Sequence, residues 1–275
     1  MAELNLLIFG IPIRIRSQTF DALEPIEQVF APFVQMELPS PPQFDYQAEL
    51  VAGNEKRYSL DRGVDPICHA VDLGAYLYYF DKDFTIQAQL LLPRLYFLHS
   101  AALEFDDKIF LMTAASGSGK STLTWALLHH GCRFLSDELS PINVDSNEVL
   151  LYPRALGLKQ QAPTPYGLPD NQLSTSRGFY LPIDASTIYD GSTRNRLRAI
   201  FHVQYDPNHL TPSIQSMSKA MASTLLYTNT LNPLSHNNAG LQAAVSICKD
   251  VESFKLLSAD LTQTCELLKS TINQL

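Results

Sequence analysis

The stretch that most constrains this 275-residue chain runs over residues 108–140. Residues 109–113 are apolar and typical of a buried strand, residues 114–119 form a turn of small residues, and residues 121–130 are typical of a helix that ends at Gly131. A strand, a tight turn and a helix in this order bring loop N–H groups and the positive end of the helix to one point. The sequence therefore predicts an anion-binding loop.

The residue types in the turn fit a nucleotide phosphate. Gly117 and Gly119 allow positive φ values and a close approach of the main chain, Lys120 can reach the β- and γ-phosphates, and the hydroxyl of Ser121 can bind Mg²⁺. The G-x-x-x-x-G-K-[ST] pattern is broken only at its first position, by Ala114. A Gly/Ser-rich turn that carries a lysine by coincidence is the alternative. The predicted nucleotide-binding set is Ala115, Ser116, Gly117, Ser118, Gly119, Lys120, Ser121 and Thr122.

An acidic pair follows the next predicted strand. Residues 133–136 form that strand, and Asp137 and Glu138 come directly after it. Asp137 lies seventeen residues beyond Lys120. We expect this strand to return beside strand 109–113 in a parallel βαβ unit, with its carboxylates at the edge where phosphates bind. Such a pair can hold a metal and accept a proton from an attacking hydroxyl, or it can simply cap a solvated turn.

With these motifs the stretch resembles the catalytic domain of HPr kinase/phosphorylase, a bacterial Ser-protein kinase family whose P-loop core is related to phosphoenolpyruvate carboxykinase. In that family a histidine, a GxSGxGKS loop and an R/H-G-x-R-hydrophobic-x-DD segment follow one another. This chain has His99, then AASGSGKS at 114–121 and HGCRFLSDE at 130–138. The segment LYPRALGL at 151–158 is similar to the family's LEIRGLGI-like signature, but Tyr152 replaces its glutamate, which in the family helps to bind Mg²⁺.

The resemblance implies an α/β fold with a P-loop kinase core of the HPr kinase / phosphoenolpyruvate carboxykinase type, preceded by a smaller β-rich N-terminal domain. It implies ATP and Mg²⁺ as cofactors, with Ser121 and Glu138 at the metal, Asp137 as the catalytic base, Lys120 on the phosphates and His99 as an assistant to the base. The oligomeric state stays open, a homo-oligomer being one outcome that the resemblance allows.

The activity that this resemblance implies is transfer of the γ-phosphoryl group of ATP to a hydroxyl. The expected acceptor is a serine of a protein or of a ribosomal peptide precursor, as in the tailoring of lasso peptides. Two alternatives are a small-molecule kinase and a nucleotide-sensing module without turnover, the second of which Ala114 and Tyr152 permit.

No cluster of chemistry-bearing residues precedes residue 95. We therefore expect residues 1–95 to form a β-rich accessory domain that recruits substrate or covers the core, and residues 96–275 to form the catalytic domain. Strands are expected over 4–9, 11–15, 46–51, 58–61 and 70–80, and helices over 83–92, 219–226, 241–249 and 261–271. In the predicted strand 70–80, tyrosines 76, 78 and 79 indicate half-buried packing.

The proline-rich segment 153–182 is a candidate substrate loop or a long connection. Basic residues at this segment could neutralise the transferring phosphoryl group, or could be ordinary surface charges; they are Arg154, Lys159 and Arg177. Three further arginines alternate along a predicted strand and could bind an acidic substrate or guard a solvated strand edge; they are Arg194, Arg196 and Arg198.

Composition argues against a nucleic-acid-binding, a zinc-binding and a membrane-spanning protein. An apolar fraction of 45% and a charged fraction of 17% are typical of a globular chain, and a net charge of −8 argues against a nucleic-acid partner. The four cysteines lie far apart, without zinc-ligand spacing, and are expected to be buried or free thiols in a reducing compartment. Because we find neither a signal peptide nor an apolar run of the ~20 residues that span a bilayer, we expect a cytoplasmic protein without a membrane partner.

Overall fold

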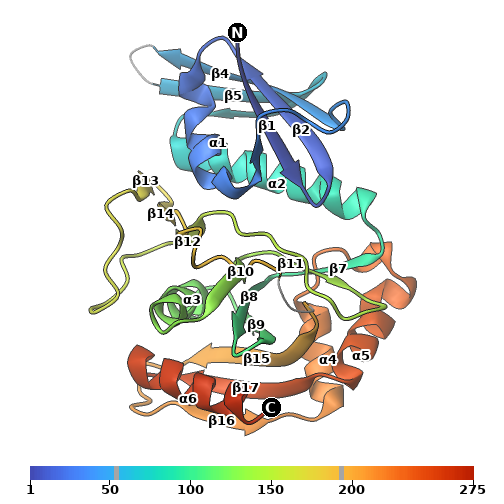
Figure 1. Cartoon of the computed structure of the whole chain (residues 1–275), viewed down its shortest axis with the longest axis vertical. Coiled ribbons are helices and arrows are strands. Elements are labelled where there is room, and N and C mark those ends of the chain that lie inside the picture. The colour runs from blue at the N-terminus through green and yellow to red at the C-terminus, as the bar shows by residue number, and fades with distance from the viewer. Residues whose placement is uncertain (53–55, 192–194) are drawn as a thin grey trace. The chain divides into compact units, whose positions relative to one another are not determined.

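The computed structural model describes residues 1–52, 56–191 and 195–275, and the chain divides into two compact units (Figure 1). The first unit comprises Met1–Leu91, Arg154–Pro163 and Gly167–Ile183, and the second comprises Leu92–Pro153, Thr164–Tyr166 and Asp184–Leu275. The chain first passes from one unit to the other between Leu91 and Leu92, close to the expected domain boundary at residue 95. The expectation that residues 96–275 form one continuous domain is wrong, because most of the segment 154–183 belongs to the first unit.

The first unit is built on a six-stranded sheet in the order β3-β1-β2-β4-β5-β6. Neighbouring strands are antiparallel, except that β2 and β4 are parallel. Strand β2 alternates as predicted, with its isoleucines buried and Pro12, Arg14 and Arg16 partly exposed. Short helices η1 (Phe20–Ala22), α1 (Glu24–Val29) and η2 (Ala31–Phe33) connect β2 to β3. The strands are β1 (Ala2–Ile8), β2 (Ile11–Ser17), β3 (Val34–Gln35), β4 (Phe44–Ala52), β5 (Lys56–Arg62) and β6 (Asp65–Ala70).

The predicted strand over 70–80 is wrong, because these residues mostly belong to the nineteen-residue helix α2 (Leu73–Leu91). Tyr76, Phe80, Phe84 and Ala88 are fully buried at a spacing of four, which is the period of a helix. Asp72 accepts a hydrogen bond from the backbone N–H of Ala75 at 2.9 Å, as an N-capping aspartate does. Helical periodicity and this cap outweigh the strand preference of tyrosine.

A three-stranded sheet formed by the segment 154–183 completes the first unit. Its order is β12-β14-β13, with β12 (Leu156–Leu158), β13 (Leu173–Thr175) and β14 (Gly178–Leu181). The backbone N–H of Ala155 donates to the carbonyl of Val29 at 2.8 Å, which ties this segment to the N-terminal part of the chain. Gly178 has φ +123°, and a Cβ there would lie 2.1 Å from the carbonyl oxygen of Leu158, so only glycine fits.

The second unit contains a six-stranded sheet in the order β10-β8-β9-β15-β17-β16. Strands β9, β15 and β17 are parallel neighbours, whereas β8 pairs antiparallel with both β9 and β10. The expectation that β10 lies directly beside β9 is therefore wrong, because β8 lies between them. The strands are β8 (Ser100–Phe105), β9 (Lys108–Ala114), β10 (Arg133–Ser136), β15 (Leu197–Tyr205), β16 (Ser213–Ser216) and β17 (Glu252–Ser258).

Helices cover both faces of this sheet, with α3 and α6 on one side and α4 and α5 on the other (Figure 1). The apolar core under α4 and α5 includes Ala102, Leu111 and Ile200 from three adjacent strands. Strands β7 (Leu95–Leu98) and β11 (Ser140–Asn143) form a separate antiparallel pair. The helices are α3 (Lys120–His129), α4 (Lys219–Thr228), α5 (Leu241–Lys249) and α6 (Leu261–Asn273), with short helices η3 (Pro233–Ser235) and η4 (Asn237–Gly240) before α5.

The four cysteines are free and buried, as predicted. Among the helices that the structure describes, none has both the length and the apolar character needed to cross a membrane. The predicted C-terminal helices are confirmed as α4, α5 and α6. Helix α5 has the predicted bounds, whereas α4 and α6 extend beyond the predicted carboxyl ends, to Thr228 and Asn273.

Candidate functional site

The loop 115–119 connects β9 to α3 at the carboxyl end of the strand. Gly117 and Gly119 have φ values of +84° and +80°, in the left-handed region that glycine adopts without strain. Ala114, at the position where the motif has its first glycine, is still part of the extended strand, where a methyl side chain is tolerated. Gly119 precedes α3 and has no side chain with which to cap it, so the amino end of the helix is open to an anion.

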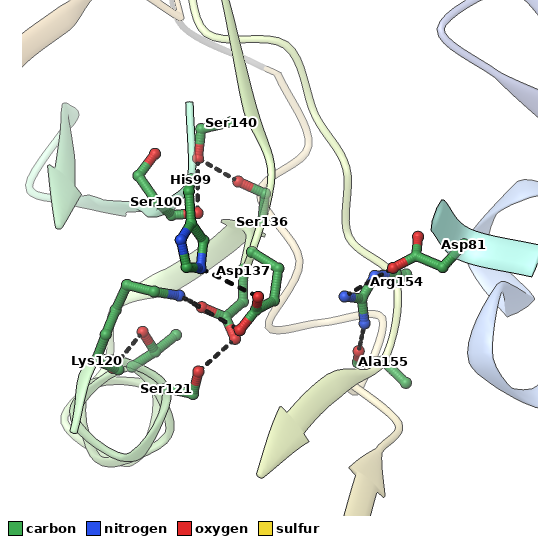
Figure 2. A network of polar contacts seen from close by, with 12 residues as sticks. Asp81, His99, Ser100, Lys120, Ser121, Ser136, Asp137, Ser140, Arg154 and Ala155 are labelled. Atoms are coloured by element: carbon green, nitrogen blue, oxygen red, sulfur yellow. Dashed lines mark hydrogen bonds and ion pairs between the residues drawn. The ribbon is translucent and has the colours of Figure 1, made fainter. Parts of the chain in front are cut away.

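Two side chains from the start of α3 meet one carboxylate (Figure 2). The Nζ atom of Lys120 forms an ion pair with Oδ1 of Asp137, and the hydroxyl of Ser121 donates to Oδ2 of Asp137 at 2.8 Å. Lys120 is 7% exposed and Asp137 2% exposed, so this charge pair is almost removed from solvent. The carboxylate that the sequence places after strand 133–136 thus lies at the lysine and serine of the loop motif.

Glu138 extends this cluster to a second segment of the chain. Its Oε2 atom lies 3.1 Å from Nε2 of His99, and its Oε1 atom lies 3.9 Å from Nζ of Lys120. His99 stands between β7 and β8, where its backbone N–H donates to the carbonyl of Asn229 at 2.9 Å. Figure 2 shows His99, Lys120, Ser121 and Asp137 side by side in the second unit. The contacts of Glu138 with His99 and Lys120 add it to this cluster.

Glu138 adopts φ +71°, a left-handed conformation that costs a residue with a Cβ about 1–2 kcal/mol. We expect Glu138→Gly to be more stable to denaturant than Glu138→Ala by about 1 kcal/mol, because only glycine relieves this strain while both variants lose the carboxylate. Chemical unfolding of the two variants measures the difference. Equal stabilities would mean that the backbone at this position is not strained.

Serines that the sequence did not single out hold the acidic pair in place. The hydroxyls of Ser136 and Ser140 lie 2.9 Å apart, and that of Ser140 donates to the carbonyl of Ser100 at 3.1 Å (Figure 2). These bonds fix the chain on both sides of Asp137 and Glu138 to the start of β8. In the sequence, two serines four residues apart flank the acidic pair, and this pattern is the signal that could have indicated their supporting role.

Tyr152 stands where the family signature has glutamate, and it is fully buried. Its backbone N–H donates to the carbonyl of Leu135 at 2.9 Å, so it lies beside the strand that ends in the acidic pair. A phenol at this position offers no carboxylate to a cation. In the described part of the chain, no group of three or more His, Cys, Asp or Glu side chains could by itself hold a metal ion.

The oxygen atoms present nevertheless fit Mg²⁺ that arrives with a polyphosphate. Ser121, Asp137 and Glu138 offer a hydroxyl and two carboxylates, which are the oxygen ligands that Mg²⁺ prefers, and this ion commonly takes its remaining ligands from phosphates and water. The carboxylates of Asp137 and Glu138 both face the ammonium of Lys120. A divalent cation that accompanied a polyphosphate would offset the negative charge that its phosphates add beside these carboxylates.

The basic residues predicted to contact substrate all belong to the first unit. Arg154 is buried, pairs with Asp81 at 3.2 Å and donates to the carbonyl of Ala155 at 2.9 Å. The guanidinium of Arg177 lies 4.6 Å from the ring centroid of Tyr78, and Lys159 is exposed. None of the three belongs to the unit that carries Lys120 and Asp137, so a role toward substrate stays a prediction.

Two of the three arginines predicted to alternate along a strand, Arg196 and Arg198, lie at the end of the sheet opposite the loop. Arg196 and Arg198 are exposed at the amino end of β15, where Leu197 pairs with Ile109 of the parallel strand β9. The loop 115–119 follows the opposite, carboxyl end of β9. These two arginines therefore do not join the loop, and Arg194 lies outside the described residues.

Comparison with known proteins adds a distant structural likeness. Neither a protein-family model nor a curated protein sequence matches this chain. Among solved structures, the chain is similar to the Hpr(Ser) kinase/phosphatase from Coxiella burnetii, with 13% sequence identity and a TM-score of 0.31 over 65% of this chain and 88% of that one. At this TM-score the two backbones agree only loosely, so the function proposed below rests on the residues of this chain.

Proposed function

We propose that this protein is an ATP-dependent kinase that transfers the γ-phosphoryl group to a hydroxyl, with a serine of a protein or peptide as the acceptor. The observation that carries the proposal is the meeting of Lys120 and Ser121, which open the helix after the loop, with the buried carboxylate of Asp137. A lysine, a hydroxyl and an acid around an open helix terminus are the groups that phosphoryl transfer requires.

The residues divide into those that bind and those that move a proton. The N–H groups of loop 115–119 and the amino end of α3 would bind the phosphates, and Lys120 would offset their charge. Ser121 and Glu138 would hold Mg²⁺, which when bound supplies further charge neutralisation. Asp137 would accept the proton of the acceptor hydroxyl, and His99 would act through Glu138, to which it is hydrogen bonded.

A protein or peptide acceptor is favoured by the resemblance of residues 99–158 to a family of Ser-protein kinases, and by a separate first unit that could recruit such a substrate. A module that binds nucleotide without turnover is the second candidate. It is favoured by Tyr152, whose phenol replaces a carboxylate that in the resembling family helps to bind the metal.

Incubation of the protein with γ-labelled ATP and Mg²⁺ tests the proposal. Parallel reactions contain serine-bearing peptides, small hydroxyl compounds or no acceptor. We expect label on the peptide serine, and loss of this label when the peptide carries alanine instead. Label only on a small compound would replace the peptide by a small-molecule acceptor. Retained ATP with binding measurable by calorimetry would favour the sensing module, and absence of binding would overturn both.

A further inference from the structure

A row of three buried polar side chains crosses the sheet beside the loop. Ser100 of β8 pairs in register with Thr113 of β9, and Thr113 pairs with His202 of β15. On the same face of the sheet, the next row is two residues further along each strand; it consists of Ala102, Leu111 and Ile200, is apolar and belongs to the core under α4 and α5. The polar row is thus the point at which the apolar core ends, toward the edge where the loop begins.

The row lies one pair before the end of strand pairing between β9 and β15. Beyond the pair of Thr113 and His202, β9 and β15 share only the pair of Ala114 and Val203, and the loop starts at residue 115. On the other side, Ser100 directly follows His99, which contacts Glu138. Thr113 therefore connects the strand end that carries the loop to both neighbouring strands.

The imidazole of His202 is hydrogen bonded to Thr113. Its Nδ1 atom lies 2.6 Å from the hydroxyl oxygen of Thr113, and its side chain is 7% exposed. Burial lowers the pKa of His202 to about 4, so the ring is neutral at neutral pH. Within the residues that the structure describes, neither Nε2 of His202 nor the hydroxyl of Ser100 has a hydrogen-bond partner.

A buried imidazole with an unmade hydrogen bond lowers the stability of the fold, and apolar side chains at both position 202 and position 113 would avoid this loss. Stability therefore does not explain why a histidine and a threonine are paired here. What the imidazole does provide is a rigid partner for Thr113, next to the residue from which the chain leaves the sheet.

We infer that His202 is a positioning residue for the loop: through Thr113 it fixes the direction in which the chain leaves β9 and thereby the place of the loop N–H groups and of Lys120. The part of this inference that is measured as a reaction rate rests on the proposed kinase function. Because phosphoryl transfer depends on the alignment of the reacting groups, a loosened strand end is expected to slow the reaction more than it weakens nucleotide binding.

The test compares His202→Leu, Thr113→Val and the double variant in the full chain. We expect each single variant to lower kcat for transfer from γ-labelled ATP about tenfold, to change the Kd for Mg·ATP less than threefold, and to raise hydrogen exchange of the amides in loop 115–119. The double variant should be no slower than either single variant, because both remove the same hydrogen bond. His202→Gln and Thr113→Ser, which keep a hydrogen-bonding group, should recover part of the rate.

Melting temperatures separate positioning from mere folding. We expect the double variant His202→Leu/Thr113→Val, which leaves neither member of the hydrogen bond unpaired, to melt no lower than the unchanged protein, so that its loss of rate does not follow a loss of stability. A stable His202→Leu variant with unchanged kcat and unchanged loop exchange, or additive effects of the two single variants, would overturn the inference. If the unchanged protein transfers no phosphoryl group while loop exchange still rises in the variants, the proposed function fails and the positioning role stands.

Discussion

Replacement of Lys120 by methionine is expected to lower the rate of phosphoryl transfer at least a thousandfold and to weaken binding of Mg·ATP. Methionine keeps much of the length of the side chain and removes its charge. The ammonium faces both Asp137 and Glu138 at the start of α3, so its loss removes a positive charge that would lie beside the phosphates. Single-turnover transfer and calorimetry measure the two effects.

The same replacement is expected to lower the free energy of unfolding by about 3–5 kcal/mol, because the carboxylate of Asp137 is left buried without its ion-pair partner. The double variant Lys120→Met/Asp137→Asn removes both charges and should recover most of this stability without recovering activity. Lys255→Met is the matched control, since this lysine is exposed on β17. Normal transfer by a folded Lys120→Met protein would exclude the proposed role of the loop.

The change Asp137→Asn is expected to slow the transfer step by about 10²–10⁴-fold while ATP affinity stays within about threefold of that of the unchanged protein. Asparagine retains the shape of the side chain and an oxygen that can accept the hydrogen bond from Ser121, which lies 2.8 Å from the carboxylate. It cannot accept the proton of an acceptor hydroxyl. The loss should therefore appear in the rate of transfer at saturating ATP.

Asp184→Asn is the matched control for this experiment, because Asp184 is exposed and its carboxylate bonds only to nearby Ser186 in the contacts that the structure gives. A single-turnover rate for Asp137→Asn equal to that of this control would show that Asp137 is not the base. Glu138 would then be the remaining carboxylate within reach of Lys120, and Glu138→Gln would test it in the same assay.

Local sequence patterns correctly predicted the part of the molecule in which the conformation of each residue depends on its near neighbours in sequence. Strand β9, the glycine-bearing loop and α3 follow from an apolar run, two left-handed glycines and a helical apolar face. The short strand after that helix indicated that Asp137 ends a strand, whereas its contact with Lys120 depends on the place of β10 in the sheet, next to β8. Along β2, alternating isoleucines likewise determined which side chains face the core.

Where two local patterns competed, the choice depended on packing. Tyrosines favour strands, yet Tyr76, Phe80 and Phe84 repeat with a helical period, and their burial under the first sheet selects the helix α2. The segment 154–183 has no sustained period. Its place in the first unit depends on strand pairing within β12, β13 and β14, and on the bond from Ala155 to Val29, between residues far apart in sequence.

The sequence by itself determined the geometry of the loop 115–119 and the residues that begin the helix after it, because backbone conformation and helix termini are set by near neighbours. Only the tertiary structure decided that β8 separates β9 from β10, that Glu138 meets His99, and that His202 supports Thr113. Each of these contacts joins residues far apart in the chain. Such contacts form only where burial and strand pairing together offset the entropy of closing the intervening loop, and no local pattern records that balance.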